Sequence, residues 1–212
     1  MGDRTLEAVL KRHTSISVGP FHQGIEGHPV VIIEPSLGPP SQKRHAVEYL
    51  ANHYPGTMVL SASTTILLAK QQSWVGNRLK LWGFDPWLVA IDAKRLTIVG
   101  PDALKPAPWD HFYGWEWDRI EDSIGGVFAR VIAPLVNEAM AYRALGLSDR
   151  DIDRAIRLGL NHPQGPFEWA NLFGVSNIGL VLEAMRQALG ESYFPHPEIM
   201  RCMAKEGVDW NA

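Results

Sequence analysis

The residues of this sequence best suited to acid–base chemistry are a carboxylate, a hydroxyl and an imidazole. Asp85 lies in KLWGFDPW, residues 80–87, directly after an apolar run that is typical of a strand. Thr64 follows another such run, and His111 lies in an aromatic stretch. A carboxylate or an imidazole can move a proton when its surroundings bring its pKa near neutrality. Asp85, Thr64 and His111 are therefore the catalytic candidates if the protein is an enzyme.

Each candidate also has a structural interpretation. A hydroxyl just beyond a strand, as at Thr64, commonly caps a turn. Asp85 can cap the turn before Pro86, and His111 can simply be packed among its aromatic neighbours. His162, in HPQGPFE, is best interpreted as part of a turn between helices. No metal is expected, because no spacing of His, Cys, Asp and Glu resembles a zinc or calcium site, and the sequence has no G-x-S-x-G motif or P-loop.

The elements that position these residues change in type along the chain. Short apolar runs alternate with helical or turn segments up to residue 100, which predicts βαβ units and a parallel sheet. Beyond an aromatic connection at 106–118, the apolar period becomes helical. The expected strands are 30–33, 58–61, 79–82 and 96–99, and the expected helices are 41–52, 128–146, 148–159 and 176–189. The sequence thus predicts an α/β domain at 1–118 and an all-α domain at 119–212.

Composition excludes several classes of function. The chain has 212 residues, 46% of them hydrophobic, and a net charge of -3, which suits one compact domain or two that share a core. The Lys and Arg residues are dispersed, so no nucleic acid is expected as a partner. One cysteine, Cys202, fits a reducing compartment. No signal peptide or stretch of about 18 apolar residues is present, so we expect a cytoplasmic protein without membrane attachment.

Two segments carry a family resemblance. Residues 125–175 contain NEA, DID and HPQGPFE and closely resemble the C-terminal helical domain of the 3-hydroxyacyl-CoA dehydrogenase family. Residues 30–67 are similar to the second part of that family's NAD-binding domain. The resemblance implies a truncated, Rossmann-like parallel half-sheet followed by the helical domain. It also implies a homodimer through the helical domain or a heteromer with a full-length dehydrogenase, and an acyl-CoA-like ligand.

The departures from the family pattern concern its chemistry. The sequence contains no G-x-G-x-x-G, so the resemblance predicts no cofactor, with NAD not bound in the usual way. The catalytic histidine of the family's His-Phe-Phe-Asn-Pro falls at Trp82, and its orienting glutamate falls at Lys94. An indole cannot accept a proton from a hydroxyl. The glutamate beyond the family's strand-end Glu becomes Gly38, whereas the lysine of the next helix is kept as Lys43.

At other positions matched to the family's site residues, the residue here is either still polar or has become apolar. The substrate-contacting serine of the family's Asn-Thr-Ser-Ser turn falls at Thr64, the asparagine of His-Phe-Phe-Asn-Pro at Asp85, and an asparagine of the first C-terminal helix at Ala129. The substrate-binding residues that the resemblance implies are Ser63, Thr64, Trp82, Asp85, Ala129 and Arg130.

These observations predict a divergent 3-hydroxyacyl-CoA dehydrogenase-like protein that has lost NAD-dependent hydride transfer. It would act as a non-catalytic ligand-binding or dimerising subunit. One alternative is a cofactor-independent enzyme that reuses the old substrate cleft, and another is a dehydrogenase active only with a partner chain. A start codon that misses an upstream nucleotide-binding segment is also compatible with the sequence.

Overall fold

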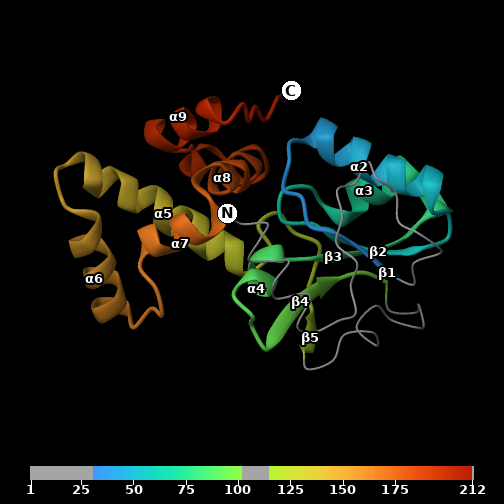
Figure 1. Ribbon diagram of the computed structural model, residues 1–212, viewed down its shortest axis with the longest axis horizontal. Helices are drawn as coiled ribbons and strands as arrows, with labels where there is room; N and C mark the ends of the chain where they lie inside the picture. Colours follow the sequence, from blue (N-terminus) through green and yellow to red (C-terminus); the bar gives the residue numbers. More distant parts are fainter. Residues whose placement is uncertain (1–30, 102–114, 212) are drawn as a thin grey trace.

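The computed structural model describes residues 31–101 and 115–211. It contains an α/β half beside a helical half (Figure 1). The strands are β1 Val31–Glu34, β2 Met58–Ala62, β3 Lys80–Phe84, β4 Arg95–Val99 and β5 Glu116–Arg119. The predicted class, α/β followed by all-α, is confirmed. His111 and the aromatic residues around it up to 114 lie outside the described residues.

The sheet is mixed, whereas the sequence predicts a parallel one. Its order is β1-β2-β3-β4-β5, with β1, β2 and β3 parallel, β3 and β4 antiparallel, and β4 and β5 parallel. Only residues 85–94 join β3 to β4, and a parallel crossover needs a dozen residues or more. Strand β5 could not be predicted from the apolar pattern, because Trp117 is the one apolar residue in it.

Helices cover the sheet and form the second half. They are α2 Pro40–His53, α3 Leu68–Val75, α4 Pro86–Ala90, α5 Phe128–Ala144, α6 Asp149–Leu160, α7 Pro166–Phe173, α8 Val175–Leu189 and α9 Pro197–Lys205, with 3-10 turns η2 Gly76–Arg78 and η4 Glu191–Tyr193. Ser148 caps α6, since its Oγ accepts from Asp151 N at 3.1 Å. None of the helices among the described residues combines the length and the apolar character needed to cross a membrane.

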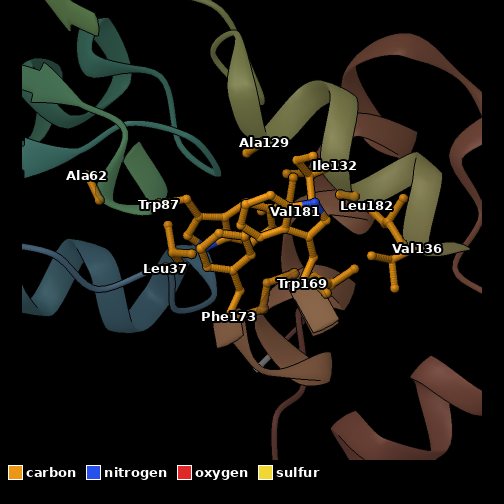
Figure 2. Packing of buried hydrophobic residues seen from close by; sticks show 14 of the residues in the cluster. Leu37, Ala62, Trp87, Ala129, Ile132, Val136, Trp169, Phe173, Val181 and Leu182 are labelled. Atoms are coloured by element: carbon orange, nitrogen blue, oxygen red, sulfur yellow. The ribbon is translucent and has the colours of Figure 1, made fainter. Parts of the chain in front are cut away.

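Two cores lie on opposite faces of the sheet, because successive side chains of a strand alternate between its faces. Val59 and Leu81 belong to a core shared with α2 and α3. Leu60 and Trp82 belong to a larger core that continues without a break into the helical half. Figure 2 shows its middle, where Trp87 and the residues of α7 meet side chains of α5 and α8. The sheet and the helices therefore share one apolar interior.

The closest approach in this core generates a stability prediction. A Cβ added at Gly100 would overlap the indole of Trp82, whereas one added at Gly159, inside α6, would meet nothing. Gly100→Ala should therefore cost about 1–3 kcal/mol of unfolding free energy through overpacking. Gly159→Ala should be neutral or stabilise by up to about 1 kcal/mol, because alanine favours a helix interior. Urea denaturation of both variants tests this, and equal midpoints would contradict it.

Candidate functional site

Trp82 occupies the position where the family resemblance places a catalytic histidine. It is the central residue of β3, opposite Leu60 of β2, and only 1% of it is exposed. Its ring packs in the large core and against Gly100. It lines neither of the two cavities described below. The side chain therefore acts as a packing unit, and an indole in this place offers no proton acceptor.

Thr64 and Asp85 do come together, at the ends of β2 and β3. They line a small cavity of about 10 Å³, which has room for roughly one water molecule and no more. Its lining residues are Ser63, Thr64, Phe84, Asp85, Thr97, Val99, Ile120, Ser123 and Gly126. Thr64 is buried, and its hydroxyl has no hydrogen-bond partner among the described residues. The cavity thus offers a hydroxyl and a carboxyl to a very small guest.

Asp85 is held by the backbone of two elements. Its Oδ1 accepts from Trp87 N at 2.9 Å and caps α4, and its Oδ2 accepts from Ala129 N at 3.4 Å in α5. The carboxyl is 3% exposed. Burial raises its pKa to about 6, and the donating amides offset part of that rise. Asp85 therefore both caps a helix and carries a proton that titrates close to neutral pH.

The remaining predicted site residues lie beside this cavity or away from it. Ala129 contributes its backbone amide to Asp85 but has no polar side chain. Arg130 is turned to the loop before α5, where Nε donates to Ile124 O at 3.0 Å and Nη2 donates to the same oxygen. Lys94 lies outside both cavities. Within the described chain, no group of three His, Cys, Asp or Glu side chains could hold a metal ion.

A larger pocket lies between the two halves of the protein, with a volume of about 270 Å³. The α/β half contributes Pro35, Ser36, Leu37, Gly38, Pro39, Gln42, Pro86, Trp87 and Ala90, and the helical half contributes Leu172, Phe173, Asn177, Leu180 and Val208. Trp87 and Phe173 stack with ring centroids 4.4 Å apart. This stack joins α4 to α7 and forms a rigid aromatic wall.

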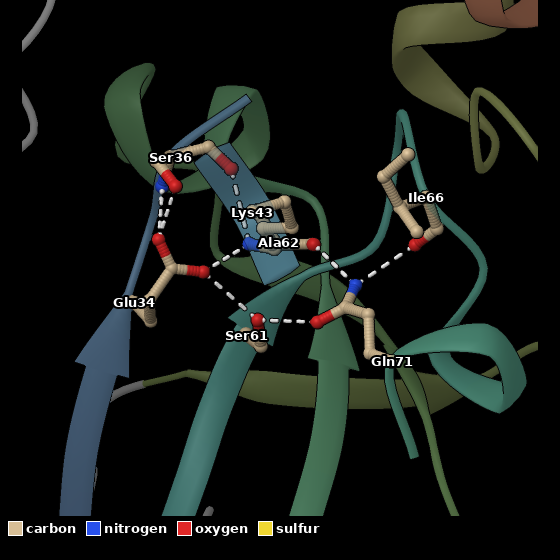
Figure 3. A network of polar contacts seen from close by, with 7 residues as sticks. All are labelled: Glu34, Ser36, Lys43, Ser61, Ala62, Ile66 and Gln71. Carbon is tan, nitrogen blue, oxygen red and sulfur yellow. Dashed lines mark hydrogen bonds and ion pairs between the residues drawn. The ribbon is translucent and has the colours of Figure 1, made fainter. Parts of the chain in front are cut away.

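A mostly buried polar network includes Ser36 of the 35–39 segment that lines the pocket (Figure 3). Lys43 Nζ is paired with Glu34 Oε2 and donates to Ser36 O at 3.0 Å, and neither Lys43 nor Glu34 is exposed by more than 4%. Burial lowers the pKa of the Lys43 amine, and Glu34 opposes that effect. Ser61 Oγ lies 2.9 Å from Glu34 Oε2 and 2.7 Å from Gln71 Oε1. The network ties β1, α2, β2 and α3 together at the ends of the strands.

Sequence reasoning missed most of the pocket and most of this network. Phe173, Asn177 and Leu180 are about 90 residues away from Trp87 in the chain, and no periodicity connects them. The network did leave a signal, because a charged residue that ends a bare β-branched run, as Glu34 does, needs a buried partner. Lys43, on the next helix, is the buried cation that pairs with Glu34.

The fold over most of the chain is similar to that of solved dehydrogenases. The crystal structure of M. tuberculosis FadB2 superposes with a TM-score of 0.67 at 20% identity, over 84% of this chain and 66% of that one. The (S)-3-hydroxybutyryl-CoA dehydrogenase of Ralstonia eutropha gives 0.63 at 19% identity, over 86% and 68%. The fold is therefore an α/β sheet followed by a helical domain, as in these two structures.

The C-terminal part of the sequence matches a known family. Residues 125–208 match the 3-hydroxyacyl-CoA dehydrogenase, C-terminal domain. A probable 3-hydroxybutyryl-CoA dehydrogenase of Deinococcus radiodurans is 31% identical over 88 residues, 41% of this chain and 32% of that protein. The C-terminal part of the chain is therefore similar to the C-terminal domain of this family. Its sequence matches span about a third of the length of the curated relatives.

The prediction that the protein takes no cofactor is wrong as judged by these relatives. The matching family model and the curated relatives are dehydrogenases by name, and a dehydrogenase transfers hydride with a redox cofactor. The described residues include the carboxyl ends of β1, β2 and β3, where open α/β sheets receive nucleotides. A glycine-rich turn for a pyrophosphate is not among them, so we assign no residue to cofactor binding and derive no step through it.

The buried pair predicts an asymmetric response to mutation. Lys43→Met leaves Glu34 buried without a cation and should cost about 3–5 kcal/mol of unfolding free energy. Arg44→Met is the matched control on the same helix, and its exposed pair with Glu48 should contribute no more than about 1 kcal/mol. Urea denaturation compares the two variants. The pair is unimportant to the fold if Lys43→Met loses no more stability than Arg44→Met.

Asp85 predicts a pH dependence of stability. Its folded pKa of about 6 exceeds the unfolded value of about 3.9. The folded state therefore binds more protons between these values, and the protein should lose up to roughly 3 kcal/mol as pH rises from about 4 to about 6. Asp85→Asn keeps an acceptor for Trp87 N and should remove that loss, so it should stabilise the protein at pH 7.5.

Urea denaturation at pH 4.5 and pH 7.5 checks this prediction. Glu138→Gln, which removes an exposed carboxylate from α5, is the control and should leave the pH dependence unchanged. An Asp85→Asn protein that is less stable than wild type at pH 7.5 would show that the ionised carboxylate is favoured in the fold.

Proposed function

We propose that this 3-hydroxyacyl-CoA dehydrogenase-like protein binds an acyl or acyl-CoA-like ligand between its two halves and does not itself carry out the family's hydride transfer. The observation that carries the proposal is Trp82. A core indole, 1% exposed, stands where the family resemblance requires an imidazole base. General base catalysis needs a titratable group within hydrogen-bond reach of the substrate hydroxyl, and Trp82 supplies none.

The geometry around Trp82 supports binding rather than turnover. The cavity beside Thr64 and Asp85 is too small for an acyl group, with about 10 Å³. The pocket lined by Trp87 and Phe173 is about 270 Å³ and is mostly apolar, as ligand sites generally are. The names of the relatives support the ligand class, since they are 3-hydroxybutyryl-CoA dehydrogenases.

Assembly through the helical half belongs to the same proposal. Among the described residues, the large apolar side chains that are exposed all lie between Val127 and Met200. They are Val127, Val131, Tyr142, Leu145, Leu147, Leu158, Leu160, Leu189, Phe194 and Met200. Exposed apolar side chains that gather into one patch favour a protein contact. A homodimer and a heteromer with a full-length dehydrogenase both remain predictions, as does the cytoplasmic location.

A ligand titration tests the proposal. Acetoacetyl-CoA, free CoA and NADH are titrated in parallel by thermal shift and by calorimetry. Acetoacetyl-CoA should raise the melting temperature, because a ligand that binds only the folded state stabilises it by mass action. No oxidation of NADH should accompany binding. Trp82→Phe is the control, and since Trp82 does not line the pocket, ligand affinity should persist in it. Turnover of acetoacetyl-CoA by the wild-type chain would refute the proposal.

Asp85 favours a second candidate, an enzyme that uses acid–base chemistry in the small cavity. Its carboxyl has a pKa raised to about 6 by burial and shares a cavity with the unpartnered hydroxyl of Thr64. Groups of this kind gather at catalytic sites. Asp85→Asn separates the two candidates, because catalysis by the Asp85 proton is lost in this variant while ligand binding in the larger pocket is kept.

A further inference from the structure

The 270 Å³ pocket between the halves is lined without a single charged side chain. Its polar lining residues are Ser36, Gln42 and Asn177, and two of these are already engaged. Ser36 Oγ donates to Glu34 Oε1, and Asn177 Nδ2 donates to Phe173 O at 2.8 Å. Gln42, which is exposed on α2, offers an amide at the rim, and Asn177 keeps its second N–H and its Oδ1. The pocket therefore presents a mostly apolar, uncharged surface to a guest.

The charged pair of the polar network does not alter this character. Lys43 lies behind the 35–39 segment, but its Nζ is spent on Glu34 Oε2 and Ser36 O. Glu34 is itself 4% exposed. Figure 3 shows that the two charged groups point at each other within the network rather than out of it. Since each charge is neutralised by its neighbour inside the protein, neither is available to pair with a charge on a ligand.

The size and rigidity of the pocket suit a chain of several carbons. Its 270 Å³ exceeds the roughly 150 Å³ of a cavity that accepts benzene. The Trp87–Phe173 stack continues to Trp169, whose ring lies 5.4 Å from that of Phe173. Three stacked rings cannot easily rearrange to let water follow a polar group inward, because interiors packed in this way resist deformation.

We propose that this pocket takes the uncharged tail of an acyl ligand and excludes a tail that ends in a carboxylate. The inference rests on the proposed function, and it adds the chemical class of the tail. A carboxylate entering here would give up its hydration without meeting a cation, and the few neutral amides of the lining replace only part of that hydration, which is unfavourable. A methyl end meets the apolar surface of Leu37, Leu180 and the aromatic wall, and its burial is favourable.

Calorimetric titration with hexanoyl-CoA, adipoyl-CoA and free CoA tests the inference. The two thioesters share the CoA part and a six-carbon chain and differ in the terminal group. Hexanoyl-CoA should bind at least tenfold more tightly than adipoyl-CoA. If both bind equally, or adipoyl-CoA binds more tightly, the inference is overturned while the proposed function stands. If neither thioester binds better than free CoA, the proposed function fails and the inference falls with it.

A charge introduced at the rim of the pocket tests whether the acyl tail lies in this pocket. Gln42→Arg places a cation at the edge of the pocket from an exposed position of α2, and it should shift the preference toward adipoyl-CoA by at least tenfold. His45→Arg adds the same group to an exposed position of the same helix outside the lining, and it should leave the preference unchanged. An unaltered preference in Gln42→Arg, or an equal shift in both variants, would show that the tail lies elsewhere and would overturn the inference.

Discussion

The buried pair between Lys43 and Glu34 is the constraint on which the arrangement of the pocket depends. Burying two charges is costly and is tolerated only when geometry and additional hydrogen bonds compensate for lost hydration. Here Ser36 N and Ser61 Oγ donate hydrogen bonds to Glu34. Gln71, whose Nε2 donates to Ala62 O and Ile66 O, in turn orients Ser61. These contacts fix the positions of the carboxyl ends of β1 and β2 relative to α2 and α3. The 35–39 segment, one wall of the pocket, is thereby fixed in place.

The strands of the first half could be predicted closely, because β-branched runs bounded by turn residues leave little choice. The direction of β4 could not, since it depends on the length of a connection that local periodicity does not report. That Thr64 and Asp85 lie close together follows from the topology, because parallel strands end at the same edge of a sheet. The pocket does not follow, since Phe173 and Leu180 reach it only after the helical half has folded back onto α4.

Two substitutions relative to the family pattern show how chemistry and packing have exchanged places along β3. Position 82, where the family resemblance places an imidazole, carries an indole that fits only because residue 100 has no side chain. Position 85 carries a carboxylate in place of an amide, held by backbone amides from α4 and α5. The strand thus carries a buried indole in its middle, and a titratable carboxyl follows just beyond its end. Both residues are buried, so both changes affect the fold as well as the site.

The unbroken core that runs from Leu60 and Trp82 through Trp87 to Ile132 and Phe173 also limits how the protein can move. Lobes of a two-part enzyme swing about a hinge only when little apolar surface joins them. Here an opening of the halves would expose stacked aromatic rings to water, so rigid-body hinge motion is strongly opposed. The pocket is itself partly open to solvent, so entry needs no such opening, and a ligand seated there would lock both halves together as one cooperative unit.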